Sequence, residues 1–164
     1  MRNQKMKKNS DKTNVMRLLE QKKIRYISHD YTNTGVISGV EVAAVLHQNP
    51  DQVFKTLVTV GASNTNYVFL LPVQKELDLK KAAKAVSEKS IRMVRSQDLL
   101  TLTGYVHGGC SPLGMKKTFK TIIDLSAAEL DTILFSGGRI GRQIELPFSE
   151  LKKVLNFELK EITV

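Results

Sequence analysis

The chain has 164 residues, of which 41% are hydrophobic, and a formal net charge of +9 at pH 7. This length and composition indicate one folded domain with a hydrophobic core and exclude a largely disordered protein. No stretch is apolar enough to span a bilayer, and the lysine-rich start lacks the hydrophobic segment of a signal peptide, so we expect a cytoplasmic protein without membrane partners.

Cysteine and histidine are scarce in this chain. Cys110 is the single cysteine, which excludes an internal disulfide and a cysteine-based zinc site and fits a reducing compartment. His29, His47 and His107 are scattered without the spacing of metal ligands. We therefore predict no metal site and no cofactor.

The excess of basic residues indicates a polyanionic partner, because a positive surface is the usual electrostatic property of nucleic-acid-binding proteins. Part of the excess lies in the polar stretch 1–12, which we interpret as a flexible basic tail. The folded domain is then expected over residues 13–164.

The first predicted elements are a helix, a strand and a second helix. Apolar residues at 15–19 follow helical spacing, and 25–31 alternates as a strand does. Ser38 and Glu41 have the spacing of a capping box that begins a helix, which is expected to end before Pro50.

The middle of the chain predicts a hairpin followed by a short helix and a strand. The segments 53–60 and 67–73 are rich in β-branched and aromatic residues and flank a turn sequence. Asp78 can cap a helix over 79–86. A small strand is expected at 91–94.

The last third combines short strands with turn-rich loops. A helix is expected over 96–103, closed by Gly104. Ser126 and Glu129 have the spacing of a second capping box. The remaining expected elements are strands at 121–124, 132–135 and 142–146, a helix at 147–155 and an extended end at 157–164.

These elements predict an α+β fold in a single domain. Several connections are too short for right-handed crossovers between parallel strands, which favours a mixed, mostly antiparallel and strongly curved sheet flanked by helices.

Two glycine-rich loops are the strongest functional feature. The segment 104–117 contains four glycines and ends in Lys116 and Lys117, and the segment 136–142 repeats the combination of glycines and cations. Glycines let main-chain N–H groups converge on an anion, to which lysines add charge. One such loop could be a tight connection, but two in a small domain suggest a shared site.

Few side chains qualify for catalysis. A lysine in an apolar strand usually extends its ammonium group to the end of the strand. Lys55 nevertheless stands out because familiar catalytic motifs are absent, so cations and backbone dipoles must do most of the work. We favour a buried filler role for Cys110 over a nucleophile, because no orienting third group accompanies it and His107. His29 and His107 are interpreted as structural hydrogen-bonding residues rather than general bases. Tyr31 is interpreted as a pocket wall or a core residue.

Three motifs in order resemble one known family. They are Phe54-Lys55-Thr56, the loop 104–117, and the loop 136–141 followed by Glu145. Together they resemble the YbaK/EbsC family, free-standing relatives of the editing domain of bacterial prolyl-tRNA synthetases, from about Val15 to the end of the chain. The resemblance implies a barrel-like sheet and deacylation of mischarged Cys-tRNA(Pro), sometimes also of Cys-tRNA(Cys).

That activity suits the sequence. A synthetase pocket for proline cannot strongly reject cysteine, because a small apolar difference contributes only roughly 1–3 kcal/mol, so a second site must remove the error. In this family the substrate's own thiol attacks its ester carbonyl and the amino acid leaves as a thiolactone. This agrees with the lack of a convincing protein nucleophile.

The resemblance also implies site residues. Cys110 departs from the isoleucine of other members, which weakens it further as a catalyst. The implied catalytic residues are Lys55 for the terminal phosphate or ribose, Gly108 for the carbonyl and Ser136 for orientation. The resemblance also implies that Tyr31 and Thr56 bind the substrate. From the two glycine-rich loops we further predict Gly109, Ser111, Gly137 and Gly138 as substrate-binding residues, and Lys116, Lys117, Arg139 and Arg142 as residues that contact tRNA phosphates.

The expected partners are aminoacyl-tRNA and, transiently, prolyl-tRNA synthetase. Two alternatives stay open at this point. One is removal of alanine from Ala-tRNA(Pro), and the other is a non-catalytic tRNA-binding or regulatory module of the same fold.

Overall fold

The structure is a computed structural model that describes residues 12–164. The predicted tail therefore lies outside the described residues, except for Lys12. The α-helices are α2 (Asn14–Gln21), α3 (Gly39–Val45), α4 (Leu79–Ala85) and α5 (Ser96–Thr103). The 3₁₀-helices are η1 (Thr32–Thr34), η2 (Pro50–Gln52), η3 (Leu125–Glu129) and η4 (Phe148–Lys153). The strands are β1 (Ile27–Asp30), β2 (Phe54–Gly61), β3 (Asn66–Pro72), β4 (Ile91–Met93), β5 (Lys120–Asp124), β6 (Thr132–Ser136), β7 (Arg142–Pro147) and β8 (Glu158–Lys160).

The strands form two sheets with the orders β1-β7-β6 and β4-β2-β3-β5-β8. Four of the strand pairs are antiparallel, and the β3–β5 and β5–β8 pairs are parallel, which confirms the mixed, mostly antiparallel α+β prediction. A parallel bridge between Val53 and Leu134 links the two sheets. The hydrogen bonding does not close them into one barrel, so the barrel-like detail is not confirmed.

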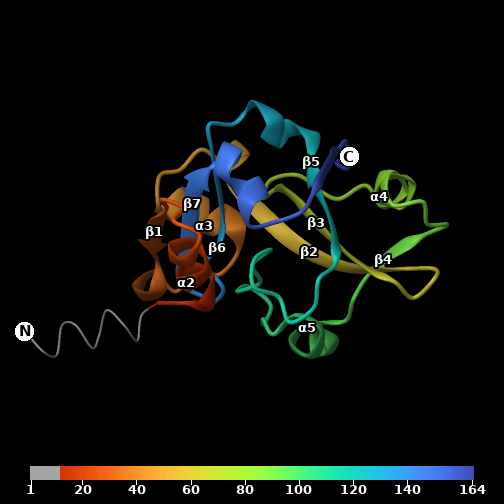
Figure 1. Cartoon of the computed structure of the whole chain (residues 1–164), viewed down its shortest axis with the longest axis horizontal. Coiled ribbons are helices and arrows are strands. Elements are labelled where there is room, and N and C mark those ends of the chain that lie inside the picture. The colour runs from red at the N-terminus through yellow and green to blue at the C-terminus, as the bar shows by residue number, and fades with distance from the viewer. Residues whose placement is uncertain (1–11) are drawn as a thin grey trace, which may run out of the picture.

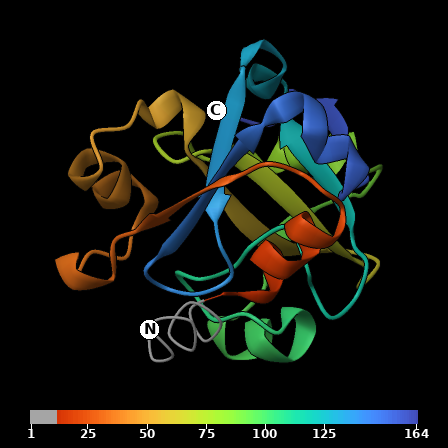
Figure 2. The ribbon, with the colours of Figure 1, turned by 60° about the vertical axis from the view of Figure 1, so that its left-hand side comes forward.

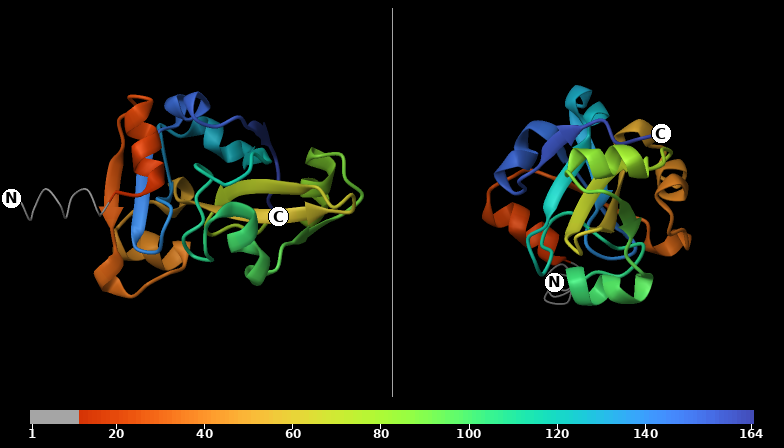
Figure 3. Two further views of the ribbon diagram at one scale, coloured as in Figure 1. Left: turned by 60° about the horizontal axis from the view of Figure 1, so that its bottom comes forward. Right: turned by 90° about the vertical axis from the view of Figure 1, so that its right-hand side faces the viewer.

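The main hydrophobic core lies between the two sheets. It includes Leu19 from α2, Leu70 from β3 and Phe135 from β6, all of them fully or almost fully buried. Figure 1 places α2 at one end of the molecule and α4 at the other, and Figure 3 (left) shows the β2–β3 hairpin reaching toward α4. In Figure 2, β1 crosses in front of its partner β7.

Local sequence patterns placed several element ends correctly. The Ser38 hydroxyl accepts a hydrogen bond from the Glu41 N–H at 3.3 Å, as the capping box predicts. Asp78 caps α4 by accepting from two backbone N–H groups. Gly104 ends α5 with a left-handed φ of 85°.

The structure corrects one predicted cap and refines two predicted helices. The turn at 126–129 is capped by Asp124, whose carboxylate accepts from the Ser126 N–H, because the 3₁₀-helix η3 begins two residues earlier than the capping box predicts. The helix expected at 147–155 is present as the shorter 3₁₀-helix η4. α3 ends at Val45, before Pro50 as expected, and Pro50 begins η2. Within residues 12–164, no helix is long and apolar enough to cross a membrane.

Candidate active site

A cavity of about 550 Å³ lies beside the first half of β2. β4 pairs with β2 only from Thr59 onward, so the edge of β2 near Thr56 is not paired with β4. The cavity occupies this position, between α3 on one side and the β4–α5 connection with the glycine loop on the other. It brings together five sequence-predicted residues, which are Tyr31, Lys55, Thr56, Gly108 and Ser136.

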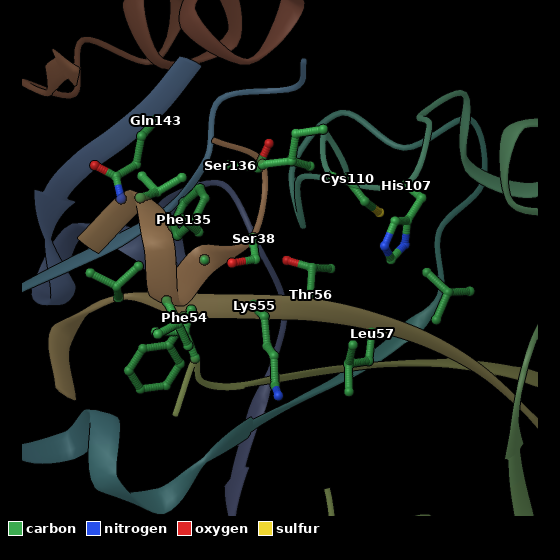
Figure 4. A pocket seen from close by; sticks show the side chains of 18 of the residues that line it. Ser38, Phe54, Lys55, Thr56, Leu57, His107, Cys110, Phe135, Ser136 and Gln143 are labelled. Atoms are coloured by element: carbon green, nitrogen blue, oxygen red, sulfur yellow. The ribbon is translucent and has the colours of Figure 1, made fainter. Parts of the chain in front are cut away.

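Lys55 and Thr56 leave β2 in opposite directions, because side chains alternate along a strand. Figure 4 shows Thr56 on the same side of β2 as Ser136 and His107, with its hydroxyl directed toward Ser38, whereas Lys55 extends away on the other side of the strand. The Thr56 hydroxyl is buried and has no hydrogen-bond partner among the described residues. A buried hydroxyl without a partner is costly, so this group is suited to a ligand that supplies one.

Lys55 is half-buried, and this burial lowers the pKa of its ammonium group, while Glu76 partly opposes the shift. Lys55 lies at the edge of the cavity. This position suits a cation that binds an anion just outside the space that Thr56 faces.

The glycine loop is held in shape by its own hydrogen bonds. The buried Thr103 hydroxyl donates to the Leu99 carbonyl at 2.8 Å and accepts from the Tyr105 N–H at 3.0 Å. Ser111 is fully buried and accepts from the Leu113 N–H. Predicted as a substrate-binding residue, Ser111 is thus placed in the loop's internal framework and does not line the cavity.

Gly108 brings the glycine loop to the cavity. It has a φ of 88°, a conformation that favours glycine, and its N–H has no hydrogen-bond acceptor among the described residues. An added Cβ would lie 2.6 Å from a methyl carbon of Ile37. The Gly108 amide is therefore available to a ligand oxygen, at a point where a side chain would not fit.

The two glycine-rich loops meet at Gly109. A Cβ on this residue would lie 2.9 Å from the Arg139 Cα and from the Ile140 nitrogen, so only glycine allows the two backbones to approach so closely. Gly109 is buried and does not line the cavity. The two loops thus lie in contact, but of the glycine loop only Gly108, with His107 and Cys110, reaches the cavity.

The second loop is a turn between β6 and β7. The Ser136 hydroxyl accepts from the Gly138 N–H at 3.2 Å, and the Gly137 N–H donates to the Arg142 carbonyl at 2.9 Å. Ser136 lines the cavity, whereas Gly137 and Gly138 shape the turn behind it. The Tyr31 N–H donates to the Gly141 carbonyl, which ties this loop to the segment after β1.

Sequence reasoning missed Gln143 in the cavity wall. It lies opposite Ser136 in the β6–β7 register and is 3% exposed. Its amide exchanges two hydrogen bonds with the amide of Gln48, at 2.6 and 3.0 Å. This pair ties the connection after α3, and with it one cavity wall, to β7. No local pattern could have indicated it, because the two residues are 95 positions apart.

Cys110 lines the cavity, but burial raises the pKa of its thiol to about 12. The thiol is therefore a poor nucleophile near neutral pH. The burial supports the interpretation of Cys110 as a filler residue.

The predicted phosphate-binding residues lie around the loops rather than in the cavity lining. Lys116, Lys117 and Arg139 are exposed. Arg142 is half-buried, and its guanidinium lies 3.3 Å from the Asp30 carboxylate. Among the described residues, no group of three or more histidine, cysteine, aspartate or glutamate side chains could hold a metal ion.

A family model described as "aminoacyl-tRNA editing domain" matches residues 35–154. The chain belongs to this family. A protein of Enterococcus faecalis named "Putative Cys-tRNA(Pro)/Cys-tRNA(Cys) deacylase EbsC" is 41% identical to it over 158 residues, which are 96% of each chain. The resemblance to YbaK/EbsC proteins is thereby confirmed.

Solved structures share the fold of this editing domain. A crystal structure described as "a putative trans-editing enzyme for prolyl tRNA synthetase" is 21% identical, with a TM-score of 0.78 over 93% of this chain and 98% of the other. The hypothetical protein APE2540 is 19% identical, with a TM-score of 0.83 over 92% of this chain and 99% of the other. At these identities the likeness concerns the fold alone.

Proposed function

We propose that this protein is a trans-editing deacylase that removes cysteine from mischarged Cys-tRNA(Pro) and also from Cys-tRNA(Cys). Family membership and the name of the 41% identical relative support this proposal. The observation that carries it is a single cavity holding the buried, unpartnered Thr56 hydroxyl and the free Gly108 amide beside Lys55. These groups suit an aminoacyl ester on a terminal adenosine.

The proposed reaction relies on the substrate's own thiol. The sulfur attacks the ester carbonyl, the Gly108 N–H stabilises the developing oxyanion, and the 3′-oxygen of the tRNA leaves. Thr56, Ser136 and Tyr31 orient the aminoacyl group, and Lys55 binds the terminal phosphate or ribose. Because the Cys110 thiol stays protonated near neutral pH, the protein itself offers a poor sulfur nucleophile.

We also propose where the enzyme acts and which protein it contacts. The enzyme would act in the cytoplasm, where aminoacyl-tRNA is used, and associate transiently with prolyl-tRNA synthetase, which supplies tRNA identity.

The test of the deacylase activity is to incubate the purified protein with Cys-tRNA(Pro) and follow loss of the ester. Binding of the tRNA without ester loss would instead indicate the non-catalytic module.

Replacing Cys110 with serine is expected to leave most of the deacylation intact, since the attacking thiol belongs to the substrate. The measurement is the single-turnover rate on Cys-tRNA(Pro), with a melting curve as the folding control. If Cys110→Ser folds normally but loses all activity, or if a mass adduct forms on Cys110, the protein-nucleophile mechanism is correct.

Binding of tRNA is expected to weaken steeply with salt, because lysine and arginine release counterions from phosphates. If Lys116, Lys117 and Arg139 contact about three tRNA phosphates, the affinity is expected to fall roughly 20- to 40-fold between 50 and 200 mM salt. The double variant Lys116→Ala/Lys117→Ala is expected to flatten this dependence, whereas Lys22→Ala/Arg25→Ala leaves it unchanged. A flat dependence in the wild type contradicts the prediction.

A further inference from the structure

His107 is a cavity residue with no structural task in the described part of the protein. It lines the cavity, and Figure 4 shows its ring directed toward Thr56. No hydrogen bond or ion pair of the ring exists within residues 12–164. His29, by contrast, lies 2.9 Å from the Glu145 carboxylate, and that carboxylate also accepts from Thr132. The structural interpretation therefore holds for His29 and is wrong for His107.

We propose that His107 is the acid–base catalyst of the deacylation, an inference that rests on the proposed function. His107 immediately precedes Gly108, so one short turn presents an imidazole and a free main-chain N–H to the same cavity. The turn is held on both sides, by the Thr103–Tyr105 hydrogen bonds before it and by the contact of Gly109 with Arg139 after it. The turn thus fixes the backbone that carries the exposed His107 side chain beside the Gly108 N–H, and a base beside an oxyanion donor is the arrangement that acyl transfer requires.

The proton transfers balance without any further reactant. The imidazole accepts the proton of the substrate thiol as the sulfur forms its bond to the ester carbonyl carbon. The bond between that carbon and the 3′-oxygen of the tRNA then breaks, and the imidazolium returns the proton to the leaving oxygen. The products are a four-membered thiolactone and tRNA with a free 3′-hydroxyl, and His107 ends in its starting state.

The other titratable groups that line the cavity are less suited to this role. They are Tyr31, Glu41, Lys55 and Cys110. Burial raises the pKa of Tyr31 and of Cys110, so neither readily accepts a proton as an anion. Lys55 extends on the other side of β2, and Glu41 accepts a hydrogen bond from Ser38 at 2.9 Å. Histidine is also the commonest general acid–base residue in enzymes.

The test compares single-turnover rates of the wild type, His107→Gln and His107→Ala on Cys-tRNA(Pro) between pH 6 and 9. General acid–base catalysis contributes about 10²- to 10⁴-fold, so both variants are expected to lose at least about 100-fold near pH 7. Their deficit is expected to shrink as pH rises, because the substrate thiol then ionises without a base. Added imidazole is expected to restore part of the activity of His107→Ala.

A matched control is His47→Asn, which replaces an exposed histidine outside the cavity lining and suits its positive φ of 54°. It is expected to keep the wild-type rate, and all variants are expected to keep the wild-type affinity for tRNA.

Rates of His107→Gln within about threefold of the wild type at every pH overturn the proposal. An equal loss at every pH without rescue by imidazole also overturns it, since that pattern indicates a structural role. If the wild type cleaves Cys-tRNA(Pro) in either case, the proposed function stands; a wild type that cleaves nothing overturns both.

Discussion

Replacing Lys55 with alanine is expected to reduce deacylation of Cys-tRNA(Pro) by roughly 10- to 150-fold, the range that corresponds to loss of a hydrogen bond to a charged group. The Lys55 ammonium extends from the open edge of β2, on the side of the strand that Thr56 does not occupy. There it can bind the terminal phosphate or a ribose hydroxyl and hold the ester against Thr56 and Gly108. Its removal takes away this anchor without altering the chamber.

The fold is expected to survive this change. Lys55 is half-buried, and none of the described residues forms an ion pair with it, so its truncation should lower the free energy of unfolding by less than about 1 kcal/mol. The measurements are the single-turnover rate and the melting temperature. Lys80→Ala is the matched control, because Lys80 is an exposed lysine of α4 at the far end of the molecule. Near wild-type activity of Lys55→Ala would show that the site assignment is wrong.

The second large effect concerns the choice of ester. If the substrate's thiol is the nucleophile, the enzyme is expected to cleave Cys-tRNA(Pro) more than about 200-fold faster than Ser-tRNA(Pro) or Ala-tRNA(Pro). Serine is nearly the same size, but its hydroxyl is a far weaker nucleophile near neutral pH, and alanine has no nucleophile at all. Discrimination by size alone is limited to roughly 10- to 200-fold, so a larger ratio separates the two mechanisms.

The measurement is the single-turnover rate on all three esters, with product analysis for a thiolactone or its trapped derivative. The same three esters tested with Thr56→Val, which retains the shape of the side chain but removes its unpartnered hydroxyl, report whether orientation contributes equally to each. Comparable wild-type rates on cysteine and alanine esters would defeat the substrate-assisted mechanism. They would instead indicate a water-activating hydrolase and the alanine-editing alternative.

Several features of this protein were predictable from short stretches of sequence because the interactions behind them are local. The Ser38 and Asp78 caps bond to N–H groups two or three residues away, and Gly104 ends α5 through its own backbone conformation. The β2–β3 hairpin follows from its two alternating segments and their turn. Ser126 has the spacing of a cap, but Asp124, the last residue of β5, caps the turn instead.

Sequence by itself also determined the family, because three ordered motifs carry far more information than any one of them. It also identified five of the residues that line the cavity. It could not determine which way those residues point. Lys55 and Thr56 are neighbours in the chain yet face opposite sides of β2, and the cavity lies beside them, where β4 does not pair with β2.

Only the tertiary structure decided the remaining features of the site, and each depends on residues distant in sequence. Gly109 meets Arg139 across the two loops, and Gln48 pairs with Gln143 across 95 positions. Burial, which suppresses ionisation of Cys110, and the open space in front of His107 are properties of the packed molecule. Such contacts leave no periodic or spaced pattern in the chain, because they are selected by the shape of the whole fold rather than by the hydrogen bonding of one segment.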